Sequence, residues 1–88
     1  MITLYTKTDC NFCDTAKQLL RDRQLPFVEL KLNEDFTRES LLEQYHHATH
    51  YPVVVVDGYH IGGASELRTL LLRKDLQHGN QKLLNEGI

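Results

Sequence analysis

Apolar and polar positions along this chain follow patterns that predict alternating strands and helices. Ile2 to Thr6 is a short run rich in β-branched residues, which predicts a strand. From Asn11 to about Gln24 the apolar residues recur with the period of a helix, and Pro26 then breaks the chain. The residues that form this helical stripe are Phe12, Cys13, Ala16, Leu19 and Leu20.

The next two elements continue the alternation. Residues 27–32 alternate in polarity, which predicts a strand with one face more buried than the other. The residues expected on its more buried face are Val28, Leu30 and Leu32. A second helix follows, with Asn33 or Asp35 as its expected cap. The inward residues predicted for this helix are Phe36, Leu41, Leu42 and Tyr45.

The second half of the chain predicts a hairpin. Pro52 precedes Val53 to Val56, a run that is apolar on both faces and therefore typical of a central strand. Asp57-Gly58 is a preferred pair for a two-residue type I′ turn. Residues 59–61 are therefore expected to return as an antiparallel strand.

A third helix is predicted after this hairpin. Gly62-Gly63 ends the returning strand, and Ser65 is the expected cap of the helix. Its predicted inward residues are Leu67, Leu70, Leu71 and Leu76. Residues 77–88 are weakly patterned, with one or two helical turns expected from Gln81 to Glu86. The order βαβαββα predicts an α/β fold, with a four-stranded mixed sheet flanked by helices, in a single domain over residues 1–88.

Composition and charge exclude several functions. The chain has 88 residues, of which 41% are hydrophobic and 25% charged, as in an ordinary globular protein. A net charge of −2 without a Lys/Arg cluster gives no field to attract nucleic acid. The longest Val/Leu/Ile run is Val53 to Val56, and the start does not resemble an export signal. We therefore expect a cytoplasmic protein that binds neither nucleic acid nor membranes.

The two cysteines lie three positions apart at the predicted junction of strand and helix. Cys10 at the first turn is close to unpaired N–H groups and the positive end of the helix dipole, which favour a thiolate. Cys13 lies one turn later on the same face, so the pair can close a disulfide. Cys13 belongs to the apolar stripe and Cys10 projects toward solvent, which suits a shielded resolving thiol and an exposed nucleophile. Lys7 adds positive potential, whereas Asp9 and Asp14 oppose it.

A metal site is the main alternative for a close cysteine pair in a reducing compartment. Zinc needs about four ligands, and two sulfurs would have to be completed by histidines. His46, His47 and His50 follow the cysteines by more than thirty residues, far from the usual finger spacing. We therefore expect no metal and interpret these histidines as a solvated helix end.

Three segments and the order of elements together resemble the glutaredoxin family over nearly the whole chain. The segments are YTKTDCNFC at residues 5–13, YPVVVVDG at residues 51–58 and HIGGASEL at residues 60–67. The resemblance implies a thioredoxin-like fold with glutathione as cosubstrate. It makes Cys10 the attacking thiolate and Cys13 the resolving thiol.

The resemblance also implies contacts with glutathione. Tyr51 precedes the position of the family's cis-proline, Pro52, so its backbone N–H and C=O are free to pair with the cysteinyl part of glutathione. Lys7 would pair with the glycyl carboxylate, and Phe12 replaces the tyrosine that the family usually has beside the nucleophile.

A glycine-containing turn completes the implied glutathione site. Gly62-Gly63 permits close approach of a ligand backbone, and the N–H of Ser65 at a helix N-terminus would bind the γ-glutamyl carboxylate. Ala64 lies within the same turn. Two departures from the family pattern affect the site: Asn11 replaces a proline, and His50-Tyr51 replaces the usual Thr-Val.

The implied function is that of an enzyme, a glutathione-dependent oxidoreductase that reduces protein disulfides and glutathione mixed disulfides. Its protein substrates would include ribonucleotide reductase, a common client of such proteins, and we expect a monomer. One alternative is a redoxin of the same fold that is reduced by thioredoxin reductase; such redoxins generally lack the turn from Gly62 to Ser65. Another is an iron–sulfur cluster carrier, against which Cys13 argues because that role resembles the single-cysteine branch of the family.

Overall fold

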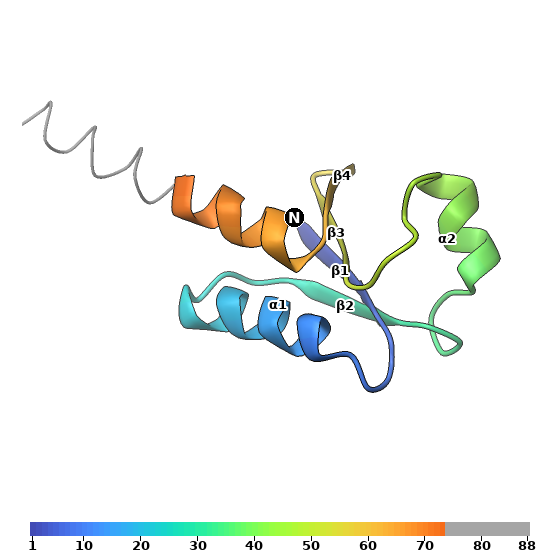
Figure 1. The fold of residues 1–88 in the computed structure, drawn as a ribbon, viewed down its shortest axis with the longest axis horizontal. Coiled ribbons are helices and arrows are strands. Elements are labelled where there is room, and N and C mark those ends of the chain that lie inside the picture. Colours follow the sequence, from blue (N-terminus) through green and yellow to red (C-terminus); the bar gives the residue numbers. More distant parts are fainter. Residues whose placement is uncertain (74–88) are drawn as a thin grey trace, which may run out of the picture.

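A computed structural model describes residues 1–73, and within this range the strands form one mixed sheet (Figure 1). The strands are β1 (Ile2–Thr6), β2 (Val28–Lys31), β3 (Val53–Val56) and β4 (Tyr59–Gly62). Their spatial order is β2-β1-β3-β4. Strand β1 pairs with β2 in parallel and with β3 antiparallel, and β3 pairs antiparallel with β4. The predicted four-stranded mixed sheet and the central position of the valine run are confirmed.

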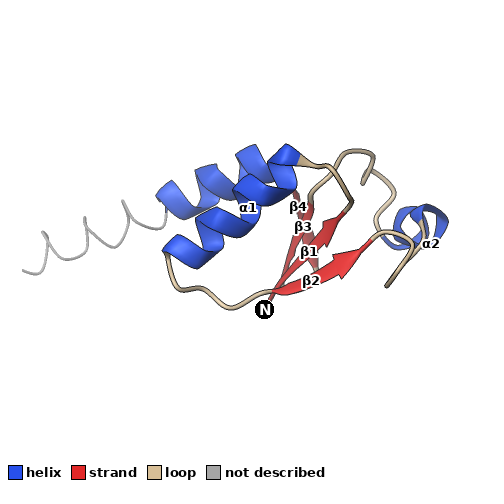
Figure 2. Ribbon diagram, turned by 90° about the horizontal axis from the view of Figure 1, so that it is seen from below, coloured by secondary structure: helices blue, strands red, loops and turns tan. Residues whose placement is uncertain are grey.

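Helices cover both faces of the sheet. Helix α1 (Asn11–Asp22) and a C-terminal helix that is described over residues 64–73 lie on one face, and α2 (Arg38–Gln44) lies on the other (Figure 2). The order is βαβαββα, the thioredoxin-like arrangement that the sequence predicts. Among residues 1–73 we find no helix long and apolar enough to cross a membrane.

The core has two parts, one on each face of the sheet. Between the sheet and the helix pair, the buried residues are Leu4, Ala16, Leu20, Val54, Ala64, Leu67 and Leu71. On the α2 side they are Tyr5, Leu41, Ala48, Val53 and Val55. Strands β1 and β3 contribute to both parts because neighbouring residues on a strand point to opposite faces. Strands β1 and β3 are thus held by packing on both faces, and they support the loops that lead into and out of them.

Helix α1 forms where its apolar stripe predicts it. The stripe residues Cys13, Ala16 and Leu20 are buried against the sheet. The helix ends at Asp22, and Gln24 then adopts a positive φ of 56°. The predicted end near Gln24 was therefore about one half-turn too late.

The hairpin between β3 and β4 follows the prediction. Asp57 and Gly58 have φ values of 51° and 86°, as a type I′ turn requires at its two central residues. Strand β4 extends one residue further than predicted, to Gly62.

The predicted cap of the second helix was wrong. Helix α2 is capped by Thr37, whose hydroxyl accepts the N–H of Ser40 while the Ser40 hydroxyl accepts the N–H of Thr37. Asn33 and Asp35 belong to the preceding turn instead, where the Asp35 carboxylate accepts the N–H of Lys31 at 2.8 Å. Local turn bonds compete with helix capping for such residues, and here the turn prevails.

The predicted cap of the C-terminal helix was also wrong. Gly63 holds the cap position, and its N–H donates to the Glu66 carboxylate at 2.7 Å. Ser65 lies inside the first turn and donates its hydroxyl to the same carboxylate at 2.9 Å. Leu67 and Leu71 are buried as predicted. The expectations for Leu76, Gln81 to Glu86 and the rest of residues 77–88 lie outside the described residues.

Candidate active site

The two cysteines are joined by a disulfide at the start of α1. Cys10 is the N-cap of this helix, and its Sγ accepts the backbone N–H of Cys13 at 3.1 Å. The Cys10 sulfur therefore already lies against an N–H donor at the positive end of the helix dipole. Both features stabilise negative charge on sulfur once the disulfide opens.

The two sulfurs differ in access. Cys10 is 9% exposed and Cys13 is 1% exposed. The order agrees with the prediction, but Cys10 is more covered than expected. The reason is its capping role, because a side chain that turns back toward the N–H of Cys13 lies over the first turn instead of projecting into solvent.

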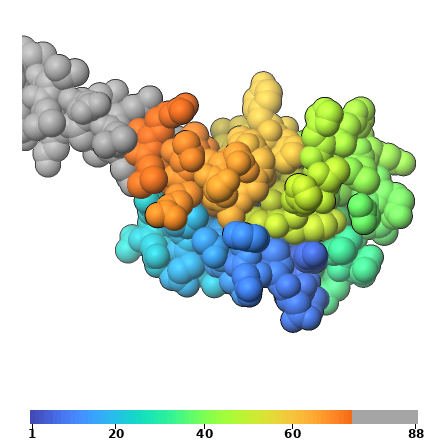
Figure 3. All heavy atoms as spheres, in the orientation of Figure 1, coloured from blue at the N-terminus to red at the C-terminus, as the bar shows by residue number. Residues whose placement is uncertain are grey.

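Beside Cys10 lies a groove with a cavity volume of about 480 Å³. This is within the range of small-molecule sites. Its walls are formed by Lys7, Asp9, Cys10, Asn11, Phe12, Arg38, Thr49, His50 and Tyr51. Residues far apart in sequence thus meet on one surface, where the blue start of α1 lies beside the yellow-green segment that precedes β3 (Figure 3).

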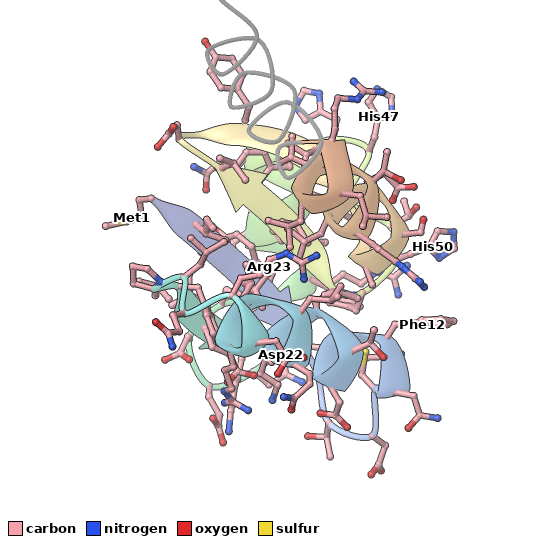
Figure 4. The ribbon with its side chains drawn as sticks, turned by 90° about the vertical axis from the view of Figure 1, so that its left-hand side faces the viewer. Met1, Phe12, Asp22, Arg23, His47 and His50 are labelled. Atoms are coloured by element: carbon pink, nitrogen blue, oxygen red, sulfur yellow. A yellow bond between two sulfur atoms is a disulfide. The ribbon has the colours of Figure 1, made fainter. Side chains whose placement is uncertain are left out.

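Three predicted ligand residues, Lys7, Phe12 and Tyr51, lie together in this groove. Phe12 is 70% exposed and projects outward on the same side of the molecule as His50 (Figure 4). The Nζ of Lys7 lies 5.7 Å from the centre of the Tyr51 ring, a cation–π distance. Arg38, the first residue of α2, adds a second cation that sequence reasoning missed.

The remaining predicted ligand residues lie beside the groove, not in its walls. The Tyr51–Pro52 peptide bond is cis, which confirms that expectation. A Cβ atom placed on Gly63 would lie 3.4 Å from the Pro52 carbonyl oxygen, so the proline and the glycine turn are in close contact. Ala64 and Ser65 begin the helix that leaves this turn.

Glu66 is the feature of this turn that the sequence did not predict. Its carboxylate accepts the N–H of Gly63 and the hydroxyl of Ser65, and these two bonds lower the pKa of Glu66 below its usual range. A negative charge therefore already lies at the helix N-terminus that was predicted to bind a ligand carboxylate. Glu66 lies three positions after Gly63, and this spacing of a carboxylate behind the cap is the sequence signal that would have indicated it.

Replacing Gly62 with alanine is expected to destabilise this turn by about 1–3 kcal/mol. Gly62 has a φ of 128°, and a Cβ atom there would meet the Glu66 Cγ at 2.5 Å. Urea unfolding of Gly62→Ala, Glu66→Ala and the double variant separates the two causes. Glu66→Ala should remove the contacts with Cγ and Oε1, at 2.5 and 2.6 Å, but keep the contact with Cβ at 2.9 Å. The clash should therefore be relieved in part, and the double variant should lose less than the sum of the single losses.

Gly58→Ala is the matched control for this cycle. Gly58 also has a positive φ, of 86°, but a Cβ atom there would have no neighbour within 4 Å. Glu66→Ala should therefore give no relief in the Gly58→Ala background. If the losses in unfolding free energy of Gly62→Ala and Glu66→Ala are strictly additive, the Glu66 side chain does not clash with a Cβ at position 62.

Metal-binding residues do not gather in the described part of the chain. Among residues 1–73, no three side chains of His, Cys, Asp or Glu are arranged to hold an ion. His46 and His47 are exposed after α2, and His50 lies in the groove wall.

Comparisons of sequence agree with this geometry. The Glutaredoxin family profile matches residues 2–61. Glutaredoxin 3 of Escherichia coli (strain K12) is 31% identical over 75 residues, which cover 85% of this chain and 90% of that protein. A hybrid peroxiredoxin of Haemophilus influenzae, hyPrx5, is 42% identical over 66 residues. The match covers 75% of this chain but spans only 27% of the length of the hybrid protein.

Comparisons of structure give the same fold. The thioredoxin-like protein BC3987 superimposes with a TM-score of 0.66 and 26% identity, over 80% of this chain and 99% of its own. The holo form of glutaredoxin C1 from Populus tremula x tremuloides superimposes with a TM-score of 0.70 over 92% of this chain and 83% of its own. Because the two sequences are only 24% identical, this match supports the same fold and nothing about function.

A thioredoxin-like fold with a disulfide at the start of its first helix, beside a groove, defines the class of thiol–disulfide redox proteins. Within that class, this chain belongs to the glutaredoxin family. Membership supports thiol–disulfide oxidoreductase activity in general, and the family uses glutathione.

Proposed function

We propose that this chain is a glutathione-dependent oxidoreductase that reduces protein disulfides and glutathione mixed disulfides. The observation that carries the proposal is the position of Cys10, which caps α1, is bonded to a shielded Cys13 and forms part of the groove wall. A sulfur so placed has both the N–H donor that favours a thiolate and a surface that receives a ligand.

The proposed reaction proceeds by two thiolate exchanges. The Cys10 thiolate attacks one sulfur of the substrate disulfide, which forms a mixed disulfide and releases the other sulfur as a thiolate. Cys13 then loses its proton and attacks the Cys10 sulfur, which releases the second substrate thiol and closes the Cys10–Cys13 disulfide. Two glutathione molecules reduce that disulfide and leave as glutathione disulfide.

Glutathione would occupy the groove with its cysteinyl sulfur on Cys10. The backbone of Tyr51, beside Pro52, would pair with the cysteinyl unit in an extended geometry. Lys7 and Arg38 supply two cations in the groove wall for the glycyl carboxylate. Gly63, Ala64 and Ser65 would receive the γ-glutamyl end, next to Pro52, with its ammonium group toward the Glu66 carboxylate that already accepts the N–H of Gly63. A buckwheat glutaredoxin solved as a glutathione complex shares the fold, with a TM-score of 0.67 at 22% identity.

A peroxidase disulfide is the protein substrate that the comparisons favour. The match to hyPrx5 falls on part of a protein named as a hybrid peroxiredoxin, and its identity of 42% exceeds that of Glutaredoxin 3. We therefore include a peroxiredoxin among the substrates, beside the ribonucleotide reductase expected from the family. The proposal places the chain as a single domain and a monomer in the cytoplasm, where a glutathione pool keeps Cys10 and Cys13 reduced.

The source of electrons tests this proposal. NADPH consumption is measured with the chain and a glutathionylated substrate, in one series with glutathione plus glutathione reductase and in another with thioredoxin reductase. We expect turnover in the first series and a rate at least about tenfold lower in the second. A faster rate with thioredoxin reductase would instead establish the redoxin alternative. The similarity of this chain to the thioredoxin-like protein BC3987 is compatible with that alternative.

A further inference from the structure

A second cavity lies beside Cys10 and extends toward β2. Its volume is about 350 Å³, and it is called the polar pocket below. Its lining residues are Thr6, Lys7, Thr8, Asp9, Cys10, Asn11, Asp14, Lys17, Glu29 and Lys31. Cys10 therefore contributes to two cavities, the groove described above and this pocket lined with charges.

A network of four side chains lies in the wall of the polar pocket. The Thr6 hydroxyl donates to Glu29 Oε2 at 2.8 Å, and the Nζ of Lys17 lies 3.2 Å from the same oxygen. Lys17 also lies 3.7 Å from Asp14 Oδ1. The side chains of Lys17 and Glu29 are only 19% and 21% exposed. Burial raises the pKa of Glu29, but the bonds from Thr6 and Lys17 outweigh it, so the pKa lies below its usual range and the group is ionised at neutral pH.

The position of Glu29 in the strand is unusual for a charge. Its register partner on β1 is Leu4, which is fully buried under the helix pair. An apolar side chain at position 29 would extend that core, and replacing a buried ion pair by packed apolar residues is often neutral or stabilising. Stability alone therefore does not explain why Lys17 and Glu29 lie here.

Opening the disulfide creates a charge on the wall of the pocket that this pair also lines. Reduction by a dithiol converts the neutral disulfide into a Cys10 thiolate and a Cys13 thiol, and the dithiol leaves as its own disulfide with release of one proton. The negative charge thus exists only in the reduced form. A nearby cation stabilises that form, and a nearby carboxylate destabilises it.

We propose that Lys17 and Glu29 are positioning residues that set how readily Cys10 holds its thiolate, Lys17 by favouring the charge and Glu29 by limiting that effect. The proposal deepens the thiol–disulfide exchange proposed above and rests on it. The charged or titratable side chains around Cys10 in the two cavities are Lys7 and Asp9 from the loop, Asp14 and Lys17 from α1, Glu29 and Lys31 from β2, and Arg38, His50 and the neutral Tyr51 across the groove.

Burial separates Lys17 and Glu29 from the other members of this set. Apart from the neutral Tyr51, the six other side chains belong to exposed residues, so water and salt screen them. Lys17 and Glu29 are about four-fifths buried and keep more of their effect on a charge at Cys10. In the intact protein their effects on the Cys10 thiolate have opposite signs and nearly cancel. Removing either charge therefore leaves the effect of the other uncompensated.

Charge removal at each position tests the proposal. Lys17→Met and Glu29→Gln are compared with Lys31→Met, the matched control, because Lys31 lines the same pocket but is exposed. Equilibration with dithiothreitol gives the reduction equilibrium, and the pH dependence of iodoacetamide alkylation gives the Cys10 titration midpoint. Neither readout needs glutathione, so a failed glutathione assay leaves this test intact.

The two variants should move these readouts in opposite directions. Lys17→Met should raise the alkylation midpoint and disfavour the reduced form by roughly three- to tenfold, and Glu29→Gln should lower the midpoint and favour the reduced form similarly. Lys31→Met should change both by less than twofold. Equal directions for Lys17→Met and Glu29→Gln, or unchanged readouts, would overturn the proposal. If either single variant fails to fold, Lys17→Gln or Glu29→Leu removes the same charge with a different side chain, and the proposal requires the same opposite shifts.

Discussion

Cys10→Ser should abolish reduction of every disulfide substrate, with a loss of at least about a thousandfold, because the thiol that remains, Cys13, is only 1% exposed and cannot reach a substrate disulfide. A serine hydroxyl at the cap position still accepts the N–H of Cys13, so the helix should remain folded. Circular dichroism before the assay checks this point. The rate is measured with a glutathionylated peptide and with a protein disulfide.

Cys13→Ser should give a different result with each of the two substrates. It keeps the nucleophile, so glutathione exchange on the glutathionylated peptide should continue, with a second glutathione resolving the intermediate. With an intramolecular protein disulfide it should stop as a covalent complex through Cys10, because release there relies on Cys13 at high effective concentration. Mass spectrometry detects that complex. An active Cys10→Ser beside a Cys13→Ser that is dead in both assays would reverse the roles.

Leu67→Ala should lower the free energy of unfolding by about 2–5 kcal/mol, a large fraction of the stability of a domain of this size. Leu67 is fully buried and belongs to the same cluster as Leu4, Ala16 and Leu20. The same helix carries the turn beside Pro52 at its start. Urea unfolding measures the loss, and activity at low temperature should fall less than stability, because the groove does not include Leu67.

Leu72→Ala is the matched control for this prediction. Leu72 is also described as helical on the C-terminal helix, but it is 47% exposed. Its truncation should therefore cost less than about 1 kcal/mol. Equal losses for the two variants would mean that this helix does not pack on the sheet as described.

Local patterns were sufficient for much of the fold. The valine run of β3, the Asp57-Gly58 turn and the stripe of α1 each depend on residues close in sequence. The run and the turn were confirmed; the stripe was confirmed at Cys13, Ala16 and Leu20 but was wrong at Phe12, which is 70% exposed. The caps were wrong where the expected capping residue makes a different local bond and a neighbouring residue takes the cap position. Thr37 displaced Asn33 and Asp35, and Gly63 displaced Ser65 because the Glu66 carboxylate reached back to it.

The site was predictable where family motifs named its residues, and not where tertiary register brings residues together. Arg38 reaches the groove because α2 packs at that end of the sheet, which no local pattern reveals. Glu29 faces α1 because β2 pairs with β1 in a register that places it beside Leu4. A charge within an alternating strand was visible in the sequence, but its partner Lys17 was not.

The helix cap at Cys10 has a consequence for how the chemical state of the protein can be observed. Its sulfur accepts the Cys13 amide at 3.1 Å in the disulfide, and a thiolate in the same place would accept it more strongly because it carries a full charge. Protonation of that thiolate weakens the bond again. The hydrogen-exchange rate of the Cys13 amide should therefore differ between the disulfide, thiol and thiolate forms, and it can be measured without any substrate.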